Sequence, residues 1–174
     1  MATLKVPVTQ SDHIQGDENA LITLVEYGDY ECPYCGAAYP IVKRIQKHFG
    51  KDLRFVFRNF PLVQSHPHAG IAAMTAELAA SKNKFWEMHD LLYENQTSLD
   101  MPNLIEYAKS LNLSAIDLQM AIEQEIFSDK IKNDFMSGVK SGVNGTPTFF
   151  INGMRHNDSF DYENLLDALS KVKK

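Results

Sequence analysis

The chain has 174 residues, a length that fits one domain or one domain with a sizeable insertion. Hydrophobic residues make up 44% of it and charged residues 22%, so the composition supports a buried core and argues against a disordered protein. The net charge of −5 argues against a nucleic-acid partner, and no stretch approaches the roughly 20 apolar residues of a membrane segment.

The N-terminal sequence MATLKVPVTQSDHIQGDENA has none of the three parts of a secretory signal. It lacks a basic region, an apolar region and a small-residue cleavage site. The expected location is therefore the cytoplasm. A chain whose signal had been removed would look the same, and it would be periplasmic.

The next segments predict a βαβ unit. Residues 21–27 are apolar and rich in β-formers, which is typical of a strand buried on both faces. Pro33 suits the first position of a helix that Gly50 ends, and Pro40 inside that helix predicts a kink. Residues 53–58 are again strand-like, so the two strands should be parallel, with a right-handed crossover.

From about residue 66 to residue 143 the apolar spacing is helical throughout, which predicts a subdomain of four or five helices. Residues 148–151 then predict a strand, the dipeptide Asn152–Gly153 predicts a hairpin turn, and a helix follows to the end. We therefore expect one α/β domain over 1–174. Its core spans about 14–62 and 143–174, and its helical insertion spans about 63–142.

The only two cysteines, Cys32 and Cys35, leave three interpretations open. A structural zinc site needs four ligands, so it would also require His66 and His68. A structural disulfide would close a very small loop and contribute little stability. A redox couple is the third interpretation. A Cys32 thiol at the helix N-terminus would have a lowered pKa, and Cys35, one turn on, could attack a mixed disulfide formed at Cys32.

Two separated motifs carry a family resemblance: EYGDYECPYC over residues 26–35 and GTPTFFING over residues 145–153. The segments RNFPL at 58–62 and HPHA at 66–69 add to it. With these motifs, the chain resembles the DsbA-like branch of the thioredoxin superfamily. It is most similar to the members without a signal, some of which are fused to sodium/proton antiporters. The resemblance implies a thioredoxin-like fold (βαβ…ββα) with a helical insertion.

The resemblance also implies roles for individual residues. Cys32 would be the attacking cysteine and Cys35 the resolving cysteine. Glu26, six residues before Cys32, would be the buried acid that exchanges a proton with the resolving thiol. Pro147 would be a cis-proline facing the disulfide, and the backbone of Thr146 would pair with an extended substrate.

Between the cysteines lie Pro33 and Tyr34, which would contact substrate and set the redox poise. Tyrosine cannot stabilise a thiolate with a positive charge as histidine can, so we expect a less oxidising couple than the periplasmic type. Asp29 and Glu31 are expected to make the nearby surface acidic, and Tyr30 could shape a substrate groove.

The leading hypothesis is a thiol–disulfide oxidoreductase that acts on protein or peptide disulfides through a mixed disulfide at Cys32. It needs no cofactor and no metal, and its redox partner is another protein or glutathione. The alternative is a zinc-binding or scaffold module without redox turnover. The motifs leave open the direction of reaction (oxidase, reductase or isomerase) and whether His66 and His68 act as acid–base groups.

Overall fold

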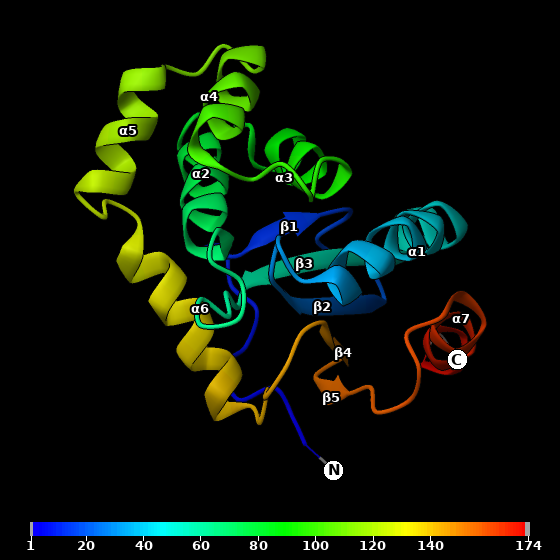
Figure 1. Cartoon of the computed structure of the whole chain (residues 1–174). Coiled ribbons are helices and arrows are strands. Elements are labelled where there is room, and N and C mark those ends of the chain that lie inside the picture. The colour runs from blue at the N-terminus through cyan, green and yellow to red at the C-terminus, as the bar shows by residue number, and fades with distance from the viewer. Residues whose placement is uncertain (1, 173–174) are drawn as a thin grey trace.

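The computed structural model describes residues 2–172. Met1, Lys173 and Lys174, which the predicted domain boundaries include, lie outside the described residues. The described part contains a five-stranded mixed sheet with the order β1-β3-β2-β4-β5, surrounded by helices (Figure 1). Within residues 2–172, no helix combines the length and the apolar character needed to span a membrane.

The centre of the sheet is the predicted βαβ unit. Strand β2 (Ile22–Gly28) leads into helix α1 (Pro33–Phe49), a short 3-10 turn follows (Gly50–Asp52), and β3 (Leu53–Asn59) lies parallel to β2. Cys32 is the N-cap of α1, and Gly50 ends the helix with φ at 52°. This left-handed conformation favours glycine. The two parallel strands and the helix between Pro33 and Gly50 are confirmed, whereas the kink at Pro40 and the right-handed crossover stay predictions.

The C-terminal segment completes the sheet beside β2. Strand β4 (Thr148–Ile151) is antiparallel to β2, and β5 (Met154–Arg155) follows through the predicted Asn152–Gly153 turn. Helix α7 (Tyr162–Val172) begins after Asp161, whose Oδ1 accepts a hydrogen bond from Asn164 N at 3.0 Å. Because β4 pairs with β2, the residues just before β4 lie beside the start of α1.

Between β3 and β4, the described chain forms five helices, which confirms the prediction of four or five. They are α2 (Ala69–Ser81), α3 (Phe85–Glu94), α4 (Met101–Ser110), α5 (Ala115–Glu123) and α6 (Ser128–Lys140). Helix α2 is buried along most of its length, and α6 leads from the far end of this group back to the sheet (Figure 1).

The two faces of the sheet have separate cores. The larger core contains Leu24, Phe55 and Phe57 with the buried sides of α1 and α3. The smaller core contains Val25, Val56 and Phe150, and it is packed by side chains of the N-terminal segment and of α6. Alternation along β2 and β3 divides these side chains between the two faces.

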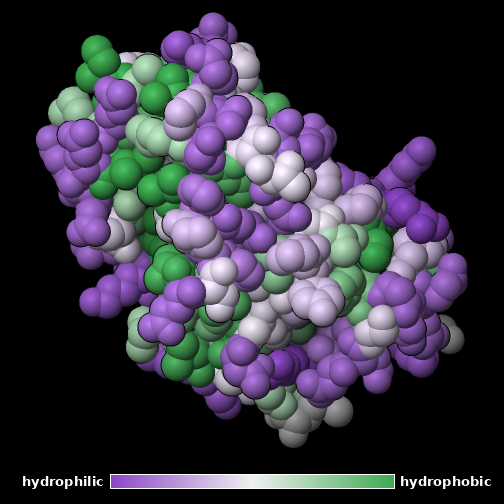
Figure 2. All heavy atoms as spheres, in the orientation of Figure 1, coloured by the Kyte–Doolittle hydropathy of each residue, from purple (hydrophilic) through white to green (hydrophobic). Residues whose placement is uncertain are grey.

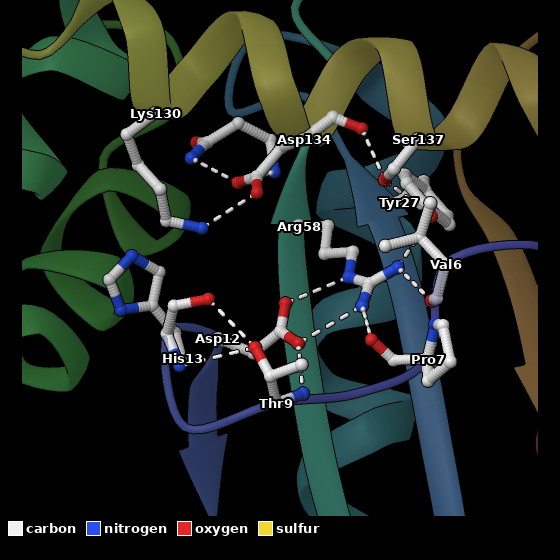
Figure 3. A network of polar contacts seen from close by, with 12 residues as sticks. Val6, Pro7, Thr9, Asp12, His13, Tyr27, Arg58, Lys130, Asp134 and Ser137 are labelled. Carbon is white, nitrogen blue, oxygen red and sulfur yellow. Dashed lines mark hydrogen bonds and ion pairs between the residues drawn. The ribbon is translucent and has the colours of Figure 1, made fainter.

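The sequence did not predict the N-terminal segment's part in the fold. Residues 13–15 form β1 (His13–Gln15), antiparallel to β3. The preceding residues are held by Arg58 of β3, which donates hydrogen bonds to Asp12, to the carbonyls of Val6 and Pro7, and to the Tyr27 hydroxyl (Figure 3). A three-residue strand has too little pattern to be recognised in sequence.

Candidate active site

The two cysteines lie at the first turn of α1, directly after the carboxyl end of β2. The turn is fixed by backbone hydrogen bonds: Cys32 N donates to Asp29 O at 3.2 Å, and Gly36 N donates to Cys32 O at 3.0 Å. Both thiols are free, and both residues are buried. Proline at the first helical position has no N–H group, and the next two backbone N–H groups, those of Tyr34 and Cys35, lie close enough to the Cys32 sulfur to stabilise its thiolate.

The Cys32 thiol is strongly acidified, with a pKa lowered to about 5. The largest cause is the hydrogen bond from the Cys35 side chain, and burial acts in the opposite direction. Further hydrogen bonds from the Thr146 side chain and from the N–H groups of Cys35 and Tyr34 also stabilise the thiolate. Cys32 is therefore a thiolate at neutral pH.

The Cys35 thiol has the opposite property, because its pKa is raised well above 9. Burial is the main cause, followed by its hydrogen bond to Cys32 and by the negative charges of Glu26 and Cys32. Two thiols one turn apart thus differ widely in acidity: one is ionised at pH 7, and the other keeps its proton.

Glu26 lies on β2, with Phe57 of β3 and Phe149 of β4 as its neighbours in the sheet. Only 2% of the residue is exposed, and within the described part of the chain no hydrogen bond contributes to the pKa of its carboxyl group. Burial, together with the charge of Cys32, raises the pKa of Glu26 to about 8. A carboxyl group with this pKa can gain or lose a proton near neutral pH.

The loop before β4 faces Cys32. The peptide bond between Thr146 and Pro147 is cis, and the Cys32 thiol donates to the Thr146 carbonyl at 3.4 Å. The Thr146 hydroxyl is buried and has no hydrogen-bond partner among residues 2–172, but it lies close enough to stabilise the Cys32 thiolate. The structure therefore brings Thr146 to Cys32 from a position 114 residues away.

The dipeptide between the cysteines is exposed, with 68% of Tyr34 accessible to solvent. An apolar pocket of about 540 Å³ lies elsewhere, under the loop 60–68, between α2 and α6. Its lining includes Val63, Ile71, Met74, Ile131 and Phe135. Hydrophobic side chains are also exposed on the side of the molecule that carries α5 and α6 (Figure 2), among them Ile116, Met120, Ile126, Met136 and Val139.

The expectation of an acidic surface at Asp29 is wrong, because Asp29 is buried. Its Oδ1 accepts from Glu31 N, and its Oδ2 accepts from Leu62 N and from His66 Nδ1, each at 2.8 Å. Asp29 is turned inwards because two of its partners, Leu62 N and His66, lie on the loop after β3, and the order of residues does not reveal this. Glu31 is only partly exposed and pairs with His68.

Tyr30 does not shape a groove either, since only 1% of the residue is exposed. Its hydroxyl is hydrogen-bonded to His89 Nδ1 at 3.0 Å, and its ring packs against Phe57 and Tyr93. The hydrophobic core takes this aromatic side chain because the turn after β2 directs it towards α3.

Gln96 is a residue of this site that sequence reasoning missed. It follows α3, and its Nε2 donates to the carbonyls of Cys32 at 2.7 Å and of Tyr30 at 3.0 Å. The helical insertion thus supports the turn that carries the cysteines. No local signal could have identified a partner more than 60 residues away.

His66 and His68, the histidines considered as zinc ligands, are each paired with a carboxylate. Across residues 2–172, no group of three or more His, Cys, Asp or Glu side chains is arranged to hold a metal ion. The geometry that the structure does provide is an acidic thiol beside a protonated thiol.

The chain is similar in sequence to a known protein family and to part of a longer protein. The family model described as thioredoxin matches residues 8–171. The chain is 42% identical over 170 residues to a Na(+)/H(+) antiporter NhaA 1 of Salinispora arenicola; this match covers 97% of the chain but 26% of the antiporter. The chain therefore spans about a quarter of the length of that relative.

Solved structures agree in fold. The oxidised BdbD of Bacillus subtilis is similar with a TM-score of 0.89 and 26% identity, over 99% of both chains. Alpha-DsbA1 of Wolbachia pipientis gives a TM-score of 0.83 at 22% identity, over 97% of this chain and 94% of that one. The resemblance to the DsbA-like branch and the thioredoxin-like fold with a helical insertion are confirmed.

Proposed function

Since the chain belongs to the thioredoxin family, we propose that it is a thiol–disulfide oxidoreductase that works through Cys32 and Cys35. The observation that supports the proposal is the difference in pKa between the two thiols. The pKa of Cys32 is lowered to about 5 and that of Cys35 is raised well above 9. A nucleophile must be ionised before it attacks, whereas a resolving thiol must wait until the mixed disulfide has formed.

The proposed reaction has two exchanges. The Cys32 thiolate attacks a substrate disulfide, forms a mixed disulfide, and releases the first substrate sulfur as a thiolate. Cys35 then loses its proton and attacks the Cys32 sulfur, so that the Cys32–Cys35 disulfide forms and the second substrate sulfur leaves. The substrate gains two electrons and the protein loses them, and the reverse sequence oxidises a dithiol substrate.

Glu26 is proposed to accept the proton of Cys35. Its pKa of about 8 means that a minor fraction is ionised at neutral pH, and the Cys35 thiol is close enough for the charge of Glu26 to raise its pKa. In the reverse direction the protonated carboxyl group returns the proton. A group with a pKa near the working pH serves both directions.

We propose that an extended protein or peptide segment binds beside the cysteines. The loop at Thr146 and Pro147 faces Cys32, and its backbone could pair with such a segment in the manner of an added strand. Pro33 and Tyr34 are exposed beside the buried sulfur and could contact the same segment from the other side. This arrangement supports a polypeptide substrate.

Cysteine replacement tests the proposed function. In an assay of insulin disulfide reduction, Cys32→Ser should abolish activity because it removes the nucleophile. Cys35→Ser should accumulate mixed disulfides with substrate because the resolving thiol is missing. If both variants kept full activity, the proposal would be wrong. Stoichiometric zinc bound through both cysteines would support the metal-binding alternative.

The direction of the reaction follows from the redox potential of the couple. Equilibration with glutathione should place it on a scale from about −270 mV, typical of the reductant thioredoxin, to about −120 mV, typical of an oxidant. We expect a value between these two ends: the low pKa of Cys32 stabilises the reduced form, but Tyr34, between the cysteines, adds no positive charge to it. The antiporter activity of the longer relatives is not part of this proposal.

A further inference from the structure

The loop between β3 and α2, residues 60–68, is joined to the cysteine turn by two histidine–carboxylate pairs. His66 Nδ1 lies 2.8 Å from Asp29 Oδ2, and His68 Nδ1 lies 2.8 Å from Glu31 Oε1. Glu31 directly precedes Cys32 in the chain, and Asp29 lies three residues before it. The loop therefore places two imidazoles next to the residues that lead into the attacking cysteine.

The pair formed by His66 is the more enclosed of the two. The Asp29 side chain is fully buried and that of His66 is 20% exposed, whereas the side chains of His68 and Glu31 are 41% and 20% exposed. Asp29 also accepts from Leu62 N, and its carbonyl accepts from Cys32 N. Asp29 thus fixes His66 relative to the backbone of Cys32. A charge held in this way is less screened by solvent than an exposed one.

Three acidic groups raise the pKa of His66: Asp29, Cys32 and Glu31. Burial alone would lower the pKa of His66, but the hydrogen bond and charge of Asp29, with further contributions from Cys32 and Glu31, raise it above its usual value. His66 therefore interacts electrostatically with the Cys32 thiolate. The main stabilisation of that thiolate still comes from hydrogen bonds at the helix N-terminus.

We propose that His66, held in place by Asp29, is the counter-charge of the Cys32 thiolate and thereby tunes the redox equilibrium of the couple. It would supply from a separate loop the positive charge that Tyr34 cannot supply between the cysteines. This inference rests on the proposed thiol–disulfide chemistry. His66 acts through Cys32 and is a positioning residue; it forms no bond with substrate.

The interaction between His66 and the Cys32 thiolate should also act on His66. When two glutathione thiols reduce the Cys32–Cys35 disulfide, glutathione disulfide forms and two protons are released. One proton binds Cys35, Cys32 remains a thiolate, and the second proton is free to bind His66 or solvent. Because the thiolate exists only in the reduced protein, His66 should bind its proton more tightly in the reduced state than in the oxidised state.

The first experiment compares His66→Gln with the matched variant His68→Gln. Glutamine can still donate a hydrogen bond to the partner carboxylate, but it carries no charge. We expect His66→Gln to raise the pKa of Cys32 by about half a unit. The absorbance of the thiolate measures this pKa. In this variant, the equilibrium constant of the Cys32–Cys35 couple with glutathione should shift about threefold towards the disulfide. This shift corresponds to a redox potential about 14 mV more reducing. His68→Gln should shift both quantities less.

The second experiment needs no substitution at the loop. NMR titration of the His66 imidazole in the wild-type protein should give a higher pKa in the reduced state than in the oxidised state, and reduced Cys32→Ser should behave like the oxidised protein. Equal values in both redox states, or equal effects of the two glutamine variants on Cys32, would overturn the inference. Such results would leave the proposed function intact, whereas a wild-type protein that fails to exchange with glutathione would contradict the proposed function itself.

Discussion

Two carboxylates at the end of β2 show how the surroundings of a residue decide its chemistry. Glu26 is buried, no hydrogen bond within residues 2–172 contributes to the pKa of its carboxyl group, and that pKa is raised to about 8. Asp29, three residues further along the chain, accepts hydrogen bonds from two backbone N–H groups and from His66. The first can exchange protons near pH 7, and the second is suited to hold structure and charge in place.

Replacing Glu26 with glutamine should slow the resolving step. Glutamine has nearly the same shape but cannot accept the Cys35 proton, so release of substrate from the mixed disulfide should slow by about tenfold or more at pH 7. Rapid-mixing measurement of mixed-disulfide decay would show this. The attack by Cys32 should change little, so an equal loss in both steps would point to a general structural defect.

The same variant should change how stability depends on pH. The pKa of Glu26 is about 8 in the folded protein and 4.5 in an unfolded chain, so the folded state keeps a proton that the unfolded state has lost. The free energy of unfolding should therefore fall as pH rises through this window. Reduced Glu26→Gln should lose that fall in denaturant titrations. Parallel curves for the two proteins would contradict the raised pKa.

At the residue scale, the sequence predicted those features of the site that depend only on residues close by in the chain. The placement of Cys32 as an N-cap, Cys35 one turn later and Glu26 in the preceding strand all follow from local pattern. The pairing of Asp29 with His66 could not be predicted, because 37 residues separate them and only the packed loop brings them together. A histidine in a turn has no local feature that identifies its partner.

At the scale of elements, the first turn of α1 depends on the helical insertion as well as on its own caps. Gln96, after α3, donates to the carbonyls of Tyr30 and Cys32. Gly36 makes room for this contact, since a Cβ at that position would lie 2.1 Å from Gln96 Oε1. The insertion and the core are therefore joined at the turn that carries the chemistry.

Replacing Gln96 with alanine should loosen this turn. Two hydrogen bonds are lost, so stability should fall by about 1–3 kcal/mol, and amide exchange of Gly36 should become faster. Gly36→Ala should have a similar effect because it displaces the same amide. Asn95→Ala is the matched control, since the Asn95 side chain bonds Leu91 within its own helix. Faster exchange at Gly36 in the control would show that the effect is not specific.

Regular elements with a long apolar pattern were the predictable ones. Strand β2, helix α1 and strand β3 have clear periodicity and clear ends, and the structure confirms them. The sequence also predicted the Asn152–Gly153 turn, because its two positive φ angles of 46° and 82° suit those residues. Strand β1 escaped prediction, because three residues form a strand only when a neighbouring strand is present.

For the whole molecule, the two faces of the sheet are covered in different ways. Helices α1 and α3 pack on the face of the larger core, whereas the other face is covered by α6 and by an N-terminal segment with little regular structure. That segment is held by Arg58, whose guanidinium donates to Asp12 Oδ1 at 2.8 Å and to Asp12 Oδ2 at 3.0 Å (Figure 3). The two side chains are only 3% and 5% exposed.

Because the Arg58–Asp12 ion pair is buried, removing one of its partners should lower the free energy of unfolding far more than removing one partner of an exposed pair. Arg58→Met leaves Asp12 without its cation and frees the carbonyls of Val6 and Pro7, so we expect a loss of about 3–5 kcal/mol. The N-terminal segment should then be cleaved readily by proteases while α1 stays protected. Glu106→Gln, which breaks the exposed pair with Lys109, should cost less than about 1 kcal/mol.

Acid provides a second measure of the Arg58–Asp12 pair. Burial alone would raise the pKa of Asp12, but the hydrogen bonds from Arg58 and from Thr9 N lower it below 3.8. The pair should therefore stabilise the protein above that pH, and this contribution should be lost as pH falls through the lowered pKa. Arg58→Met should remove this acid-dependent loss while the pKa of Cys32 stays near 5, because Arg58 contacts Tyr27 in the smaller core and Cys32 belongs to the larger core on the other face of the sheet. If the variant shifted the Cys32 titration as well, the N-terminal segment would be part of the active site's support and the two faces of the sheet would not be independent.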